Sequence, residues 1–96
     1  MLIPSEIMIA EHLIKVFLKH DGGLTCAGEW NSWHQEIRVN NDGGKPESTQ
    51  AEVFLHEIFE AINNMFDLQL DHKTITLLSE LVFQVIRRNK LDFVNP

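Results

Sequence analysis

Apolar and polar residues alternate through the first part of the chain. Between residues 6 and 19, apolar side chains recur mostly at every second position, at Ile7, Ile9, Leu13 or Ile14, Val16 and Leu18. A period of two is typical of strands that bury one face. We therefore predict two strands here, with a hairpin turn at Glu11–His12. A helix is the alternative, because neither glycine nor proline interrupts the segment.

A second alternating segment covers residues 28–40. One side of its tail carries Trp33, Gln35, Ile37 and Val39. This pattern predicts a strand, and Asn31–Ser32 is a candidate turn for a second hairpin. We expect Trp30 and Trp33 to pack on the sheet or to cover it. Together, the strands over about residues 6–40 predict a small antiparallel β-sheet.

After a loop at about 41–48, rich in glycine and Asx residues, the period becomes that of a helix. Thr49 followed by Glu52 matches a capping box, which predicts a helix over about 49–66. Its apolar residues share one broad arc, which should face the core. They are Ala51, Phe54, Leu55, Ile58, Ala61, Ile62, Met65 and Phe66.

A second helix is predicted over about 71–89. Asp71 suits its N-cap, and Arg87 and Arg88 lie in its last turn, where cations complement the helix dipole. Its expected buried stripe is Ile75, Leu78, Val82, Val85 and Ile86. The pattern predicts an α+β fold, in which a small antiparallel sheet precedes a two-helix hairpin within one domain over residues 1–96.

Composition narrows the possible partners and the compartment. The chain has 14 acidic and 8 basic residues, a net charge of −6, which disfavours nucleic acid and anionic membrane surfaces as partners. A lone cysteine, Cys26, cannot form an internal disulfide, which favours a reducing compartment. Neither a signal peptide nor a transmembrane segment is recognisable. We expect a cytoplasmic protein, either a monomer or a homodimer.

The segment from His56 to Glu60 is the strongest candidate for chemistry. Residues four apart project from the same face of a helix, so His56 and Glu60 can reach one metal ion. Glu57 is rotated by ~100° about the helix axis, and its carboxylate can act on a water beside the metal without being a ligand. This is the geometric logic of the His-Glu-x-x-His motif of zinc proteases, in which the glutamate is the general base.

The chain from Phe54 to Asn89 resembles small phage- and prophage-type zincins related to the ImmA/IrrE metallopeptidase family. The likeness is carried by Phe54-Leu55-His56-Glu57-Ile58, Ala61-Ile62-Asn63, Leu70-Asp71-His72, Leu81-Val82-Phe83-Gln84-Val85-Ile86 and Asn89. The resemblance implies one zinc ion and a minimal zincin-like fold. It also implies that the strand Gln35–Val39 runs beside the metal cleft, where a peptide could be added to the sheet near Ile37.

One departure from the family pattern is that Glu60 stands where the motif has its second histidine. Zinc accepts carboxylate oxygen, so a third ligand could restore an inventory of two histidines and one carboxylate. We expect His72 to be that ligand. The alternative is Glu80, which a regular antiparallel hairpin would bring nearer to the level of the metal.

Three functions are consistent with these residues. The first is a zinc-dependent metallopeptidase-like hydrolase acting on a peptide or protein, with His56, Glu60 and His72 as ligands and Glu57 as the base. The second is a non-catalytic, zinc-stabilised interaction protein of phage or mobile-element origin, with a degenerate zincin fold. The third is an α+β adaptor without a metal. His34 has no assigned role, and Cys26 lacks a sequence neighbour that would activate it.

Overall fold

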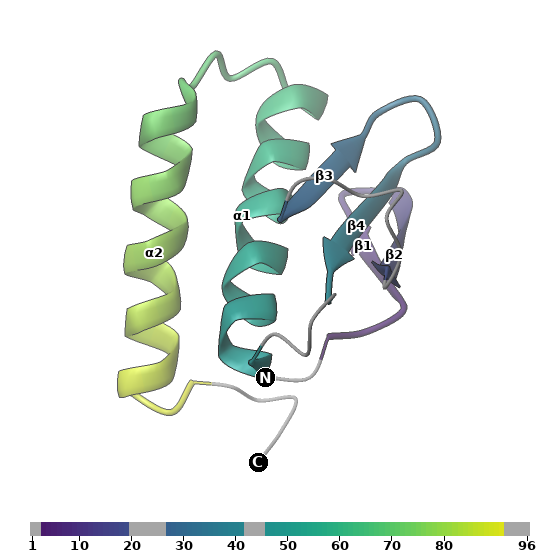
Figure 1. The fold of residues 1–96 in the computed structure, drawn as a ribbon. Coiled ribbons are helices and arrows are strands. Elements are labelled where there is room, and N and C mark those ends of the chain that lie inside the picture. The colour runs from purple at the N-terminus through teal and green to yellow at the C-terminus, as the bar shows by residue number, and fades with distance from the viewer. Residues whose placement is uncertain (1–2, 20–26, 42–45, 92–96) are drawn as a thin grey trace.

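The computed structural model describes residues 3–19, 27–41 and 46–91, which form one sheet and two helices (Figure 1). The strands are β1 (Glu6–Ile9), β2 (His12–Lys19), β3 (Gly28–Asn31) and β4 (Glu36–Asn40). The helices are α1 (Glu47–Met65) and α2 (His72–Arg88). The predicted α+β class, with a small sheet followed by a helical hairpin, is confirmed.

The sheet is mixed, with the strand order β1-β2-β4-β3. β1 pairs with β2 and β3 pairs with β4 in antiparallel fashion, whereas β2 and β4 are parallel, with Val16 opposite Ile37. The prediction of a wholly antiparallel sheet was therefore wrong. Both hairpins have short connections, which require antiparallel neighbours. The period of two is the same in parallel and antiparallel strands, so it gave no information on how the hairpins join.

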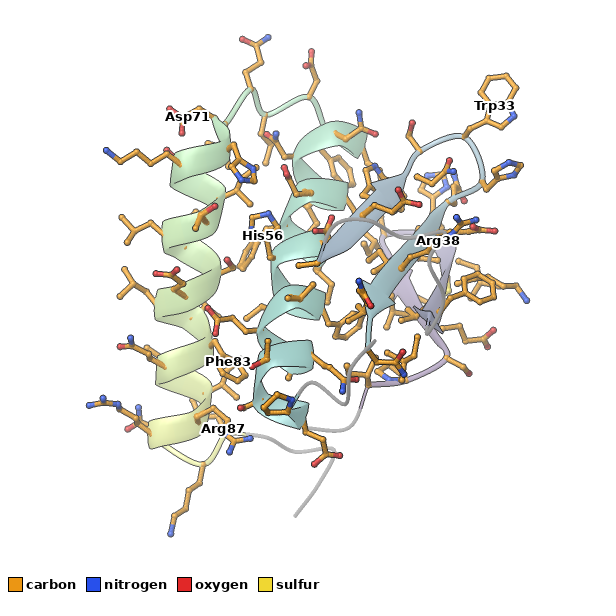
Figure 2. All side chains as sticks on the ribbon, viewed as in Figure 1. Trp33, Arg38, His56, Asp71, Phe83 and Arg87 are labelled. Carbon is orange, nitrogen blue, oxygen red and sulfur yellow. The ribbon has the colours of Figure 1, made fainter. Side chains whose placement is uncertain are left out.

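Both hairpin turns differ from the predicted positions. Ile9 pairs with His12, so the first turn is Ala10–Glu11, and Ala10 adopts a positive φ of 53°. The second turn covers residues 32–35, where the amide of His34 donates to Asn31 Oδ1. Trp33 lies on this turn with 88% of its surface exposed and projects from the sheet (Figure 2). Its predicted place on the strand was therefore wrong.

The two helices begin in different ways. α1 starts at Glu47 directly after Pro46, and no side chain caps it. The predicted capping box at Thr49 was therefore wrong, and Thr49 lies inside the first turn. α2 begins as predicted, because the Asp71 carboxylate accepts a hydrogen bond of 2.7 Å from the Thr74 amide. Within the described ranges, neither helix is long and apolar enough to cross a membrane.

α1 forms the middle layer and contacts β3 and β4 on one side and α2 on the other (Figure 1). The core between α1 and the sheet contains Ile9, Ile14, Val16, Ile37, Val39, Phe54 and Ala61. Between the helices, Ile75 and Ser79 of α2 are buried, while Leu78 and Val85 of the predicted stripe are exposed by 38% and 52%. The arc of α1 that carries His56 therefore faces a second helix.

Candidate metal centre

His56 and Glu60 lie one turn apart on α1, as the motif predicts. His56 Nε2 is 3.6 Å from Glu60 Oε2. Both side chains are partly exposed, so they border the core and remain accessible. The i, i+4 spacing alone brings these two donors together.

His72 is the first residue of α2, and its Nδ1 lies 3.3 Å from the same oxygen, Glu60 Oε2. The His56 and His72 rings meet edge to face with centroids 5.1 Å apart. The predicted preference for His72 over Glu80 agrees with this geometry. Glu80 lies further toward the C-terminal end of α2 and lines a neighbouring pocket. It is not part of the cluster of converging donors found among the described residues.

Asn63 fixes the connection that delivers His72 to this place. Its Oδ1 accepts from the Leu70 amide at 2.9 Å, and its Nδ2 donates to the Leu70 carbonyl at 3.2 Å. The connection also bends tightly, with positive φ angles at Asp67 and Gln69. Asn63 thus joins α1 to the residue two positions before His72. Sequence reasoning did not assign this role, because a side-chain bond across a connection leaves no periodic signal.

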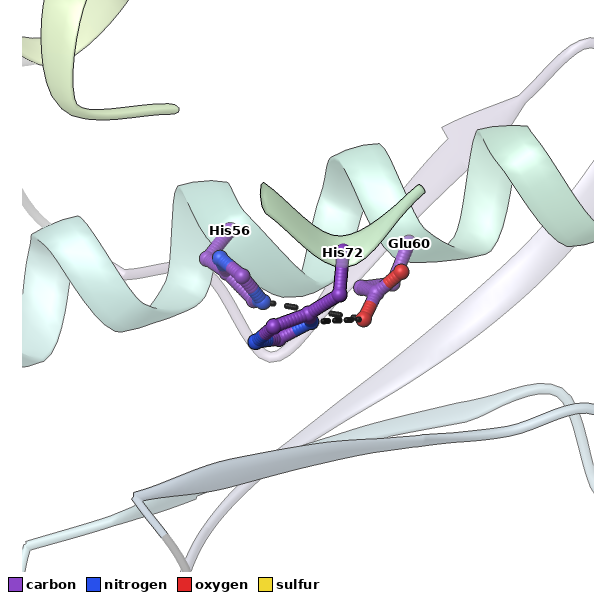
Figure 3. A group of neighbouring side chains, drawn as sticks. All are labelled: His56, Glu60 and His72. Carbon is purple, nitrogen blue, oxygen red and sulfur yellow. Dashed lines mark hydrogen bonds and ion pairs between the residues drawn. The ribbon is translucent and has the colours of Figure 1, made fainter. Parts of the chain in front are cut away.

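Together, His56, Glu60 and His72 form a cluster that could hold a metal ion (Figure 3). One nitrogen from each histidine and one Glu60 oxygen all lie within 4.8 Å of one another. Two donors bound about 2.1 Å from a tetrahedral zinc ion lie about 3.4 Å apart. The 3.6 and 3.3 Å separations of the two histidine nitrogens from Glu60 Oε2 are close to this value, and no two donors are more than 4.8 Å apart. Small side-chain adjustments would therefore let the donor set hold a divalent cation.

Glu57 is buried beside this cluster, with only 7% of its surface exposed. Desolvation, followed by repulsion from Glu60 and Glu29, raises the pKa of its carboxyl to about 7. A carboxyl with a pKa near neutrality can both accept and release a proton at physiological pH. The role predicted for Glu57 is therefore consistent with its surroundings.

Gly28 permits β3 to approach α1 closely at Glu57. A Cβ at position 28 would lie 2.6 Å from Val53 Cγ1 and 3.1 Å from Glu57 Cγ. The first distance is shorter than carbon atoms tolerate and the second is tight, so only glycine fits without a shift of its neighbours. No sequence pattern indicates this role, because the contact depends on the docking of two distant elements.

Two pockets open on the cluster, with volumes of about 440 and 460 Å³. Both are lined by Gly28, His56, Glu57 and His72. The first extends between α1 and α2 and adds Ala27, Thr49, Glu52, Val53, Thr76, Ser79 and Glu80. The second extends along β3 and adds Glu29, Trp30, Glu60, Asn63 and Asn64. His56, His72 and Glu57 are thus reachable from both pockets, and Glu60 is reachable from the second.

Other candidates from the sequence lie elsewhere. β4, which contains Ile37, is paired on both sides, so the expected addition of a peptide near Ile37 was wrong; β3 is the edge strand on that side. Trp30 donates from Nε1 to Asn64 Oδ1 at 3.0 Å and links β3 to α1. His34 is exposed on the second hairpin turn and lines neither pocket. Cys26 lies outside the described residues.

Ser79 is a further residue of the site that the sequence did not reveal. It is 2% exposed, and its hydroxyl lies 3.4 Å from His56 Nδ1. The same hydroxyl donates to the Thr76 carbonyl at 2.9 Å. In the sequence, Ser79 interrupts an otherwise apolar helical stripe, which is the signal that could have identified it.

The centre is assigned from its geometry, which combines three converging donors, a buried carboxyl group and two adjoining pockets. No protein-family model, curated protein or solved structure matches the chain.

Proposed function

We propose that the protein is a metal-dependent hydrolase of the zincin type that acts on peptide bonds. The observation that carries this proposal is the convergence of His56, Glu60 and His72 from two helices on one point. Two nitrogen donors and one carboxylate oxygen leave a fourth position of a tetrahedral ion open, which is the arrangement of catalytic zinc sites. Zinc is the proposed ion, and the resemblance to the ImmA/IrrE family agrees with it.

The residues around the donors have the properties that such a reaction needs. A bound divalent cation would polarise the scissile carbonyl and increase the acidity of water at the site. Glu57 would take a proton from the attacking water and deliver it to the leaving amine, for which a pKa of about 7 is well suited. Burial of Glu57 holds its carboxyl in place between the two pockets.

The charge of the pockets favours one kind of substrate. Among the residues that the structure describes, the charged ones that line them are Glu29, Glu52, Glu57, Glu60 and Glu80, with no lysine or arginine. Further carboxylates would be repelled from such a surface. The proposed substrates are therefore neutral or basic peptide segments.

Replacement of the proposed base tests the enzyme directly. Protein without a histidine tag should bind one zinc per chain, measured by elemental analysis, and should cleave peptides from a mixed library. Glu57→Gln should keep the zinc and lose activity by at least about a hundredfold, because general-base catalysis contributes factors of about 10² to 10⁴. Glu80→Gln, a matched change in the first pocket, should retain zinc and most of the activity.

The results can also reject the proposal. Full activity of Glu57→Gln would remove Glu57 from the mechanism. Protein that binds zinc but cleaves no library peptide would favour the second candidate, a metal-stabilised interaction protein.

A further inference from the structure

The hydroxyl of Ser79 has a single proton, and the surroundings determine where that proton points. The Thr76 carbonyl, 2.9 Å away and on the same helix, can only accept, so it takes the proton of the hydroxyl. Ser79 Oγ therefore presents a lone pair to His56 Nδ1 at 3.4 Å. A contact can form there only if Nδ1 of His56 carries a hydrogen and donates it.

The opposite nitrogen of the same ring faces the cluster of donors. His56 Nε2 lies 3.6 Å from Glu60 Oε2, on the side where His72 also approaches. A neutral imidazole has one N–H and one lone pair. A hydrogen on Nδ1 therefore leaves the lone pair on Nε2, directed at the point where the three donors converge.

We propose that Ser79 is a positioning residue, whose hydroxyl, held by the Thr76 carbonyl, selects the tautomer and orientation of His56 that bind a metal. The proposal rests on the function proposed above, since it concerns one ligand of that centre. Under this proposal, Ser79 of α2 is the hydrogen-bond partner of His56, a metal ligand on α1. Hydrogen bonds of this kind to the second ring nitrogen orient metal-binding histidines and increase their affinity for the ion.

If Ser79 only filled space between the helices, its replacement by alanine would leave the His56 tautomer and the zinc affinity unchanged. Its position between two helices needs a small side chain, and alanine would meet that need as well as serine. Alanine would also keep the helix, because it is the best helix former. Ser79→Ala therefore separates the hydroxyl from the size of the side chain. Ser48→Ala is the matched control, since Ser48 is an exposed helical serine that lines neither pocket.

The first measurement needs no metal. Long-range ¹H–¹⁵N NMR spectra of metal-free protein at about pH 8, where an ordinary histidine is neutral, report the tautomer of each ring. We expect Ser79→Ala to lower the population of His56 that carries its proton on Nδ1, relative to wild type. The exposed ring of His34 serves as an internal reference and should not change, and Ser48→Ala should match the wild type.

The second measurement is the zinc affinity, obtained by competition with a chelator. Ser79→Ala should bind zinc about 10 to 100 times more weakly than wild type, as is usual when such a partner of a ligand is lost. Ser79→Thr keeps a hydroxyl that can bond the carbonyl one turn back but adds a methyl group at a buried position, so it should restore the tautomer and part of the affinity. Circular dichroism checks that each variant is folded.

Each outcome decides one of the two proposals. Unchanged His56 tautomers in Ser79→Ala would overturn the role of Ser79. So would a changed tautomer with unaltered zinc affinity. If the wild type binds no zinc but the tautomer still responds to Ser79→Ala, the metal centre fails while the orientation of His56 by Ser79 stands.

Discussion

Glu57 places a carboxyl group where the chain would be more stable with a neutral side chain. Its burial beneath β3 and the nearby Glu60 and Glu29 disfavour the charged form. Residues held in unfavourable surroundings are frequent at functional sites, where their altered pKa serves the chemistry. His56 and Glu60, two members of the candidate metal cluster, lie beside this carboxyl.

The raised pKa of Glu57 predicts how the stability of the metal-free protein depends on pH. The pKa is about 7 in the folded state against 4.5 for the unperturbed group, so between these values only the folded state keeps the proton. Stability should therefore be greatest below about pH 4.5, as far as Glu57 is concerned, and decline as the pH rises to about 7.

Urea denaturation of wild type and Glu57→Gln at pH 5 and pH 8, with chelator present, tests this sign. At 1.36 kcal/mol per pKa unit, wild type should lose on the order of 2 to 3 kcal/mol more than the variant over this range. The difference between the two proteins cancels the contributions of other titrating groups. Parallel pH profiles for the two would show that the Glu57 carboxyl is not desolvated.

At the scale of elements, the centre depends on how α2 is attached to α1. The cap at Asp71 determines where α2 begins, and the bonds between Asn63 and Leu70 determine where that beginning lies. The position of His72 thus results from the connection as well as from helix packing. A hairpin of ideal geometry would have favoured Glu80, and this is why the sequence left both ligands open.

Asn63 and its neighbour Asn64 provide a matched pair of variants for this conclusion. Asn63→Ala should cost about 1 to 2 kcal/mol of stability for two lost hydrogen bonds and should weaken zinc binding at least tenfold, because His72 is no longer held. Asn64→Ala removes the bond to Trp30 instead and should leave zinc affinity within about threefold. Chemical denaturation and chelator competition measure both quantities.

The decisive comparison is between affinity and stability. If the two variants lose zinc affinity in proportion to their loss of stability, the attachment at Leu70 has no special effect on His72. A selective loss in Asn63→Ala supports the proposed control of the ligand by the connection.

Element types were more predictable than their assembly. Local signals located both helices, and Asp71 marked the start of α2 to the residue. The order of strands, the exposure of Trp33 and the burial of Ser79 depend on contacts between distant segments. For the candidate site, His56, Glu57 and Glu60 were proposed from their types and spacing, whereas His72 was preferred to Glu80 for its residue type and the family resemblance. Gly28, Asn63 and Ser79 act only through the partners that folding brings to them.

At the scale of the whole molecule, a chain of 96 residues has a small core, so a bound ion should contribute strongly to its stability. Zinc at 100 times its dissociation constant should add about 2.7 kcal/mol, which corresponds to a rise on the order of 10 °C in melting temperature. Scanning calorimetry with zinc and then with excess chelator measures this rise and its reversal.

Histidine variants show whether the stabilisation comes from the proposed centre. His72→Ala should lose most of the zinc-dependent rise, because it removes one of three donors. His34→Ala, at an exposed turn that lines neither pocket, should keep all of it. An equal rise in both variants would place the stabilising zinc at another position.

The three donors belong to one uninterrupted stretch of chain, from the middle of α1 to the first residue of α2. A cation that joins them closes only short loops, and the entropy lost in closing a loop grows with its length. All three donors come from α1 and α2, and no strand contributes a donor. Substitutions on the outer surface of the sheet should therefore leave the metal-binding residues and their arrangement unchanged.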